Sequence, residues 1–137
     1  MVVAYVILIV CILVMDVIWL TINKPRYNFL VRSVQGSDIS VNIGYAFITY
    51  ILVLASVLYI AIPLVRLQVQ DTRGGLLWNS VVYGGGVGLC IYGIFNFTNM
   101  SIFKDYKASV AIIDTLWGTF LYTVSCFLFL RMTMKGP

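Results

Sequence analysis

Four long apolar runs, separated by short polar segments, dominate the pattern of hydrophobic and polar positions along the chain. The runs cover about residues 2–22, 41–65, 76–103 and 108–130. A transmembrane helix needs about 20 consecutive apolar residues, so each run is long enough to cross a bilayer once. The pattern therefore predicts an all-α fold, a four-span transmembrane helix bundle in which residues 1–137 form a single integral membrane domain.

The segment between the first two runs has a helical pattern of its own. Its apolar stripe consists of Tyr27, Leu30, Val31 and Val34. Such a one-sided stripe, with basic residues outside it, is typical of a helix that lies flat in the membrane interface. Pro25 suits the first turn of this helix, and Gly36 suits its end. We expect a short interfacial helix between spans one and two; an extended loop is the alternative.

Composition agrees with a membrane protein. Of the residues, 61% are hydrophobic and 10% are charged, whereas soluble domains contain about 25% charged residues. The basic residues are scattered over all the polar segments, which is typical of cations that contact lipid headgroups. They do not form the continuous stripe of a nucleic-acid-binding protein. We therefore expect the lipid bilayer as a partner and no nucleic acid.

Polar residues inside the apolar runs are the candidates for a functional site. Asp16 lies in the first run, Asn96 and Asn99 in the third, and Asp114 in the fourth. Hydrocarbon cannot solvate such groups, so they should face protein or trapped water. In an antiparallel bundle these residues lie near the same membrane side, at depths of about 6–11 Å for a rise of 1.5 Å per residue.

The second run contributes two further polar residues at a similar depth, Tyr45 and Thr49, which share one helix face. All four spans then contribute to a single polar layer. The sequence predicts one polar cluster, structural or ion-binding, made of Asp16, Asn96, Asn99, Asp114, Tyr45 and Thr49.

Each aspartate of the cluster is followed three residues later by a tryptophan, Trp19 or Trp117. Within each pair the aspartate and its tryptophan are almost one helical turn apart, so their side chains project from the same side of the helix. We interpret the tryptophans as aromatic partners of the cluster. Their indole N–H groups either donate hydrogen bonds to it or belong to an interfacial aromatic belt.

Small residues lie close to the polar ones on the third and fourth runs. They are Gly84, Gly85, Gly88 and Gly118. Two small residues four positions apart, as in Gly84 and Gly88, allow another membrane helix to approach closely. We expect these glycines to be sites of helix packing.

Two chemical interpretations of the cluster remain open. In the first, one or both aspartates are protonated or paired and hold the helices in register. In the second, carboxylate, amide and hydroxyl oxygens form a site for a cation or proton. Catalysis lacks the necessary groups: the chain has no His, and no nucleophile stands beside a base. We expect no enzymatic activity, no catalytic residues, no metal and no cofactor.

Several segments carry a resemblance to a known family. They are MDVIWL at residues 15–20 with Tyr27 after it, Tyr50, GIFNFTN at residues 93–99, and IIDTLWGT at residues 112–119. On these segments the chain resembles the predicted membrane proteins called domain of unknown function 2177, a bacterial family with similar proteins in some large DNA viruses. The resemblance implies four spans and no assigned activity. Where the family has an aspartate before its Leu-Thr-Asn segment, this chain has Asn96.

The sequence is thus interpreted as a non-enzymatic, multi-pass membrane protein. We expect a structural or interaction component of a membrane assembly, located in a cell membrane or in the internal membrane of a virion. Other membrane proteins or capsid-type proteins would then be its partners. The alternative is a small ion, proton or solute carrier that uses the Asp/Asn cluster as its site. Such a carrier would be a homo-oligomer, because four helices leave little room for a pathway.

Overall fold

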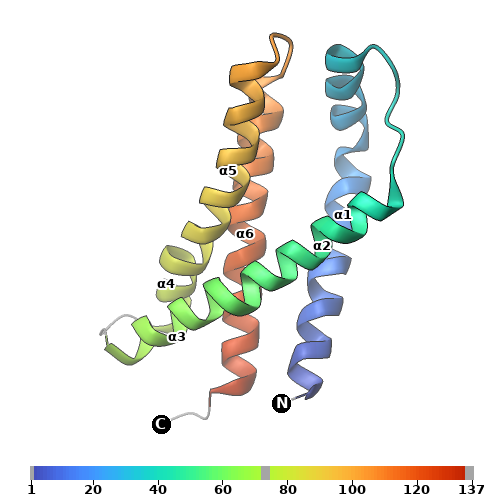
Figure 1. Ribbon diagram of the computed structural model, residues 1–137. Coiled ribbons are helices and arrows are strands. Elements are labelled where there is room, and N and C mark those ends of the chain that lie inside the picture. Colours follow the sequence, from blue (N-terminus) through green and yellow to red (C-terminus); the bar gives the residue numbers. More distant parts are fainter. Residues whose placement is uncertain (1, 72–74, 135–137) are drawn as a thin grey trace.

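The computed structural model describes residues 2–71 and 75–134, which are helical apart from short connections (Figure 1). Four helices are long and apolar enough to cross a membrane, as the four runs predict. Two of them each contain one π-helical turn, named η. In chain order the elements are α1 (Val2–Gln35); α2 (Ile43–Ser56), η1 (Val57–Ala61) and α3 (Ile62–Asp71); α4 (Leu76–Asn79), η2 (Ser80–Gly84) and α5 (Gly85–Ile102); and α6 (Ala108–Thr133).

Helix α6 is the centre of the arrangement. It contacts α1, α5, α3 and both π-turns. Figure 1 shows α6 between α5 and α1, with the second helix crossing them obliquely. On α6, Leu121, Tyr122 and Cys126 are completely buried. They pack against Ile12 of α1 and Val57 of η1 in the hydrophobic core.

The contact between α5 and α6 depends on glycine. A Cβ atom at Gly88 would overlap the backbone carbonyl group of Gly118, and a Cβ atom at Gly118 would overlap the ring of Tyr92. Gly84 and Gly85 face α6 side chains at similarly short range. Small residues let membrane helices approach closely, where van der Waals packing and hydrogen bonds hold them together. This approach places the polar residues of α5 beside those of α6.

Helix α1 does not end where the first apolar run ends. The expected break is absent, and the segment expected as a separate interfacial helix is the last part of α1, with Pro25 inside it. A proline inside a helix removes one backbone hydrogen bond and costs about 3 kcal/mol. Tertiary contacts offset this cost: Leu30 is buried, and Tyr27 donates a hydrogen bond to Asp114 of α6. The apolar stripe therefore faces the bundle.

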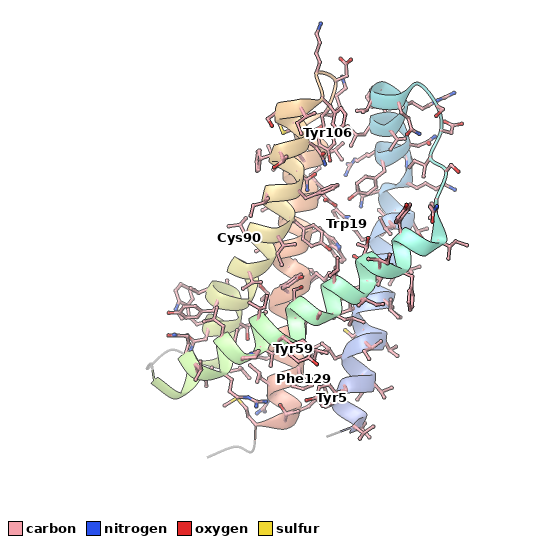
Figure 2. The ribbon with its side chains drawn as sticks, viewed as in Figure 1. Tyr5, Trp19, Tyr59, Cys90, Tyr106 and Phe129 are labelled. Atoms are coloured by element: carbon pink, nitrogen blue, oxygen red, sulfur yellow. The ribbon has the colours of Figure 1, made fainter. Side chains whose placement is uncertain are left out.

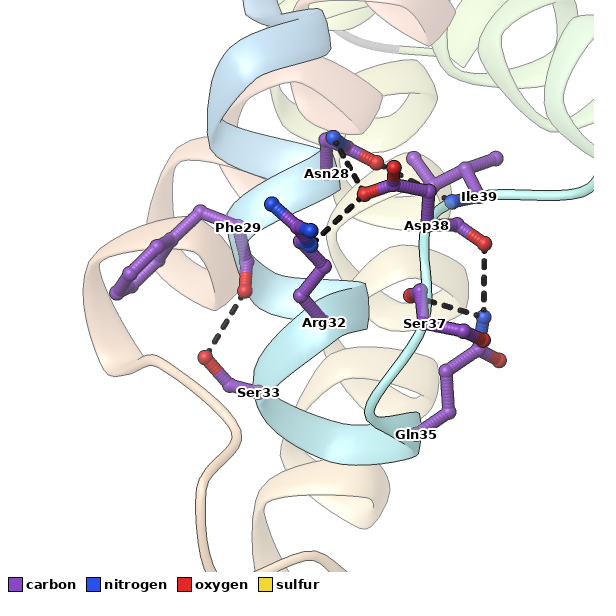
Figure 3. Close-up of polar contacts among 8 residues, drawn as sticks. All are labelled: Asn28, Phe29, Arg32, Ser33, Gln35, Ser37, Asp38 and Ile39. Atoms are coloured by element: carbon purple, nitrogen blue, oxygen red, sulfur yellow. Dashed lines mark hydrogen bonds and ion pairs between the residues drawn. The ribbon is translucent and has the colours of Figure 1, made fainter.

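After α1 the chain turns back and runs along the same helix (Figure 3). Gly36 has a φ of 76°, a left-handed conformation that glycine adopts at little cost. Asp38 then accepts a hydrogen bond from the Asn28 amide at 3.1 Å and forms an ion pair with Arg32 at 2.9 Å. As a result, α2 begins at Ile43, part-way along α1 and not level with its end (Figure 1).

Candidate functional site

Asp114 of α6 lies at the centre of a network of neutral hydrogen-bond donors. The Asn96 amide of α5 donates to its Oδ2 at 2.8 Å, and the Tyr27 hydroxyl of α1 donates to its Oδ1. Asn96, only 1% exposed, also donates to the Tyr92 carbonyl oxygen at 2.9 Å and accepts from the Tyr106 hydroxyl at 2.9 Å. Burial raises the pKa of the Tyr106 phenol further above its ordinary value. These bonds fix the Asn96 amide with an N–H toward the carboxylate.

Asp16 of α1 is bound by residues of the neighbouring helices. The indole Nε1–H of Trp117, on α6, donates to its Oδ1 at 2.8 Å. The phenol of Tyr50, on α2, lies beside the same carboxyl group. The side chain of Asp16 is thus held by contacts that come from two different spans.

The two tryptophans stack on each other, with ring centroids 4.6 Å apart and an interplanar angle of 2°. Figure 2 shows Trp19 pointing from α1 into the bundle. Trp19 Nε1–H donates to the Tyr27 hydroxyl at 2.9 Å, and Tyr27 in turn donates to Asp114. The indole of each Asp-x-x-Trp segment is therefore bonded to the aspartate of the other segment. Trp117 donates to Asp16 directly, and Trp19 is linked to Asp114 through the Tyr27 hydroxyl. Both indole N–H groups donate hydrogen bonds within the cluster. Of the two roles expected for the tryptophans, this is donation to the cluster.

Three cavities meet at Asp114. The first, of about 310 Å³, lies between α1, α2 and α6 and is also lined by Asp16. The second, of about 500 Å³, lies between α2 and α5 and has mainly apolar walls. The third, of about 270 Å³, lies between the last turns of α1 and the turn that carries Tyr106; Figure 2 shows Tyr106 at that end of the bundle. Asp114 can thus be approached from several directions.

Neither aspartate has a basic partner among residues 2–71 and 75–134. The ion pair found in this part of the chain joins Arg32 to Asp38, outside the cluster. The groups that bind Asp16 and Asp114 are indole, phenol and amide donors, all of them neutral. The two carboxyl groups therefore share a low-dielectric region in which no cationic side chain of the described residues is paired with them.

For the second span the prediction is wrong for Tyr45, whereas Thr49 lines the cavity that Asp16 and Asp114 share. Tyr45 is 72% exposed. The Thr49 hydroxyl donates to the Tyr45 carbonyl oxygen at 3.0 Å, although Thr49 lines the wall of the first two cavities. Because α2 begins part-way along α1, the residues of α2 on the first cavity are Ala46, Thr49, Tyr50 and Val53, and Tyr45 is not among them.

Asn99, the remaining expected member, lines the third cavity together with Asp114. In the part of the chain that the structure describes, it donates no hydrogen bond to that carboxylate. It lies about one turn of α5 beyond Asn96, closer to the end of the helix at Ile102.

Three tyrosines were missed by reasoning from pattern alone: Tyr27, Tyr50 and Tyr106. Tyr27 follows Trp19 by eight residues, about two helical turns, so the two share a face if the helix continues. That spacing was the available signal, and the expected break at Pro25 concealed it. Tyr106 lies in a polar turn, where nothing local indicates that its hydroxyl reaches Asn96.

Trp117→Phe should lower the free energy of unfolding by about 1.5–3 kcal/mol, the usual worth of a hydrogen bond to a charged group. Phenylalanine keeps an aromatic ring for stacking but removes the Nε1–H from Asp16. The measurement is thermal unfolding in detergent, combined with Asp16→Asn in a double-mutant cycle. Trp78→Phe is the matched control, since Trp78 is 65% exposed. Strictly additive effects of Trp117→Phe and Asp16→Asn would contradict the direct bond.

Comparison with known proteins identifies the family of this chain. Neither the curated proteins nor the solved structures contain a match to it. The family model described as "Predicted membrane protein (DUF2177)" matches residues 1–130 of the 137. This match includes all four spanning helices except the last residues of α6. The chain therefore belongs to the DUF2177 family of predicted membrane proteins.

Proposed function

We propose that the protein is a carrier of protons or cations, and that the cavity lined by Asp16 and Asp114 is its site. The observation that carries this proposal is the pair of carboxyl groups on one cavity without a basic partner among the described residues. An aspartate at the centre of a membrane helix costs about 2.5–3.5 kcal/mol. Like charges in a low dielectric also repel. A proton or cation taken from solution relieves both costs.

The extent of the cavities around Asp114 is compatible with the same proposal. A carrier must open its site to the two sides of the membrane in turn. Asp114 lines the cavity beside Tyr106 at one end of the bundle and also the cavity between α2 and α5. Four helices leave little room for a complete pathway, so we propose that the carrier acts as a homo-oligomer.

The second candidate is a structural or interaction component of a membrane assembly, including the internal membrane of a virion. It is favoured by two hydrogen bonds that tie α1 to α6 without any ligand, one from the Trp117 indole to Asp16 and one from the Tyr27 hydroxyl to Asp114. Its partners would be membrane or capsid-type proteins. Under both candidates we propose no enzymatic activity.

Proton flux into liposomes separates the two candidates. The purified protein is reconstituted, a potassium diffusion potential is applied, and a trapped pH-sensitive dye reports proton entry. We expect uptake above that of protein-free liposomes, and we expect Asp16→Asn and Asp114→Asn to reduce it to that background. Asp105→Asn is the control, because Asp105 is exposed in the α5–α6 turn.

Background flux for the unmodified protein, with the same outcome in sodium- and potassium-uptake assays, would overturn the carrier proposal. Stoichiometric co-purification with another membrane or capsid-type protein would then favour the structural candidate. Flux that survives both Asn substitutions would show a pathway elsewhere in the molecule.

A further inference from the structure

The cavity between α1, α2 and α6 has aromatic walls around its two carboxyl groups. Its carboxylate and aromatic lining residues are Asp16, Trp19, Tyr50, Tyr92, Asp114 and Trp117, and four smaller or aliphatic residues complete the lining. Its volume of about 310 Å³ lies at the small end of ligand sites, which span about 300–1,000 Å³. The cavity therefore suits a small molecule.

This set of groups offers few free oxygen ligands for an inorganic cation. A hard cation such as Ca²⁺ takes six to eight oxygen ligands, but both oxygens of Asp114 already accept hydrogen bonds, and so does Oδ1 of Asp16. The other lining residues are four aromatic and four smaller or aliphatic side chains, and their side-chain oxygens are the hydroxyl groups of Thr49, Tyr50 and Tyr92. No cluster of three or more His, Cys, Asp or Glu suited to a metal ion is found among the described residues.

An organic ammonium ion has different requirements. Its charge is attracted by carboxylates and by the faces of tryptophan and tyrosine rings, and it needs no shell of oxygen ligands. Two carboxyl groups and four aromatic side chains on one small cavity meet these requirements. The carboxylates can keep their hydrogen bonds while they balance the charge of such a ligand.

The adjacent cavity offers space for an apolar substituent. This cavity of about 500 Å³ lies between α2 and α5, and its walls include Leu52, Ile91 and Phe95. It shares Tyr92 and Asp114 with the first cavity. A ligand with a charged nitrogen in the first cavity can therefore extend a hydrocarbon group into the second.

We propose that the protein binds a hydrophobic organic ammonium ion, with its nitrogen between the two carboxyl groups and the stacked indoles. Its apolar substituent lies in the cavity between α2 and α5. This proposal rests on the proposed carrier function, because it names the substrate class of the same site.

The test uses benzyltrimethylammonium and its uncharged isostere neopentylbenzene. Both are titrated into the purified protein in detergent, and binding is followed by calorimetry and by tryptophan fluorescence. The fluorescence experiment uses the Trp78→Phe variant, in which the remaining tryptophans are the stacked pair Trp19 and Trp117. We expect saturable binding and a fluorescence change with the cation, and neither with the isostere.

Asp16→Asn and Asp114→Asn should each weaken cation binding by about thirtyfold or more, the effect of removing one partner from a buried charge pair. Asparagine keeps the size of the side chain, and thermal unfolding checks that each variant is folded. Tyr59→Leu is the control for loss of a tyrosine, because Tyr59 is 80% exposed. It should leave the affinity unchanged.

The outcomes for binding and for proton flux are distinguishable. Absence of cation binding, with proton flux intact, overturns the substrate class and leaves the carrier proposal standing. Binding of the isostere as tightly as the cation overturns recognition of charge. Binding that is unchanged in both Asn variants places the ligand outside this cavity and also overturns the proposal. Binding of the cation supports the site, but it overturns the carrier if protons, sodium, potassium and the ammonium ion itself all fail to enter the liposomes above background.

Discussion

Gly88→Ala is expected to lower the free energy of unfolding by about 3 kcal/mol, the upper end of the usual cost of overpacking. The added Cβ atom would overlap the backbone carbonyl group of Gly118. A backbone group, unlike the end of a flexible side chain, cannot move aside unless the helices separate. Separation of α5 from α6 would also stretch the bond between Asn96 and Asp114, since one residue lies on each helix.

Gly86→Ala provides the matched control for this prediction. It makes the same chemical change two residues away, but a Cβ atom there would meet nothing within 4 Å. Alanine favours a helix by about 1 kcal/mol over glycine, so this variant should be as stable as the unmodified protein or more stable. Thermal unfolding of both variants in the same detergent makes the comparison. Equal shifts for the two would show that the close approach at Gly88 does not hold the bundle.

Asp114→Leu is expected to lower the free energy of unfolding by about 2–6 kcal/mol. Two donors, the Tyr27 hydroxyl and the Asn96 amide, lose their acceptor, and each orphaned buried group costs about 1–3 kcal/mol. Asp114→Asn keeps one acceptor oxygen and should cost about half as much. In the liposome assay, by contrast, both variants should be equally inactive, because an amide cannot take up a proton or balance a cation.

Chemical or thermal unfolding of the two variants measures the stability order, with Asp105→Leu as the exposed control. We expect the unmodified protein to be the most stable, Asp114→Asn to be intermediate and Asp114→Leu to be the least stable. A Leu variant as stable as the unmodified protein would mean that Asp114 holds no structure. An Asp114→Asn variant that is folded and still transports would show that transport does not need the Asp114 carboxyl group.

The depth of the site along the bundle could be predicted from the sequence. A helix rises by a constant amount per residue, and antiparallel spans with short turns bring their ends together. Counting from the ends of the apolar runs therefore placed Asp16, Asn96 and Asp114 in one layer, and the structure puts Asp16 and Asp114 on one cavity and bonds Asn96 to Asp114. Residue spacing also identified the close-packed glycine face of α5.

The rotation and offset of the helices could not be predicted in the same way. The level at which α2 starts depends on how Asp38 binds Arg32 and Asn28, and these contacts exist only after the chain has turned back. Tyr45 was therefore assigned to the wrong face. Likewise, proline has a low local preference for a helix interior, but contacts with α6 keep Pro25 within α1 and so bring Tyr27 to Asp114.

The π-turn η2 also bears on how the length of this chain can vary in evolution. A π-turn accommodates one residue more than the α-helix around it. Loss of one residue within Ser80–Gly84 would restore a regular α-helix and leave the orientation of the following turns unchanged. Loss of one residue between η2 and Asn96 would instead rotate that side chain by about 100° relative to the preceding turns and away from Asp114. We therefore expect homologous chains to differ by one residue at this turn. The number of residues between η2 and Asn96, the eleven from Gly85 to Phe95, should stay constant.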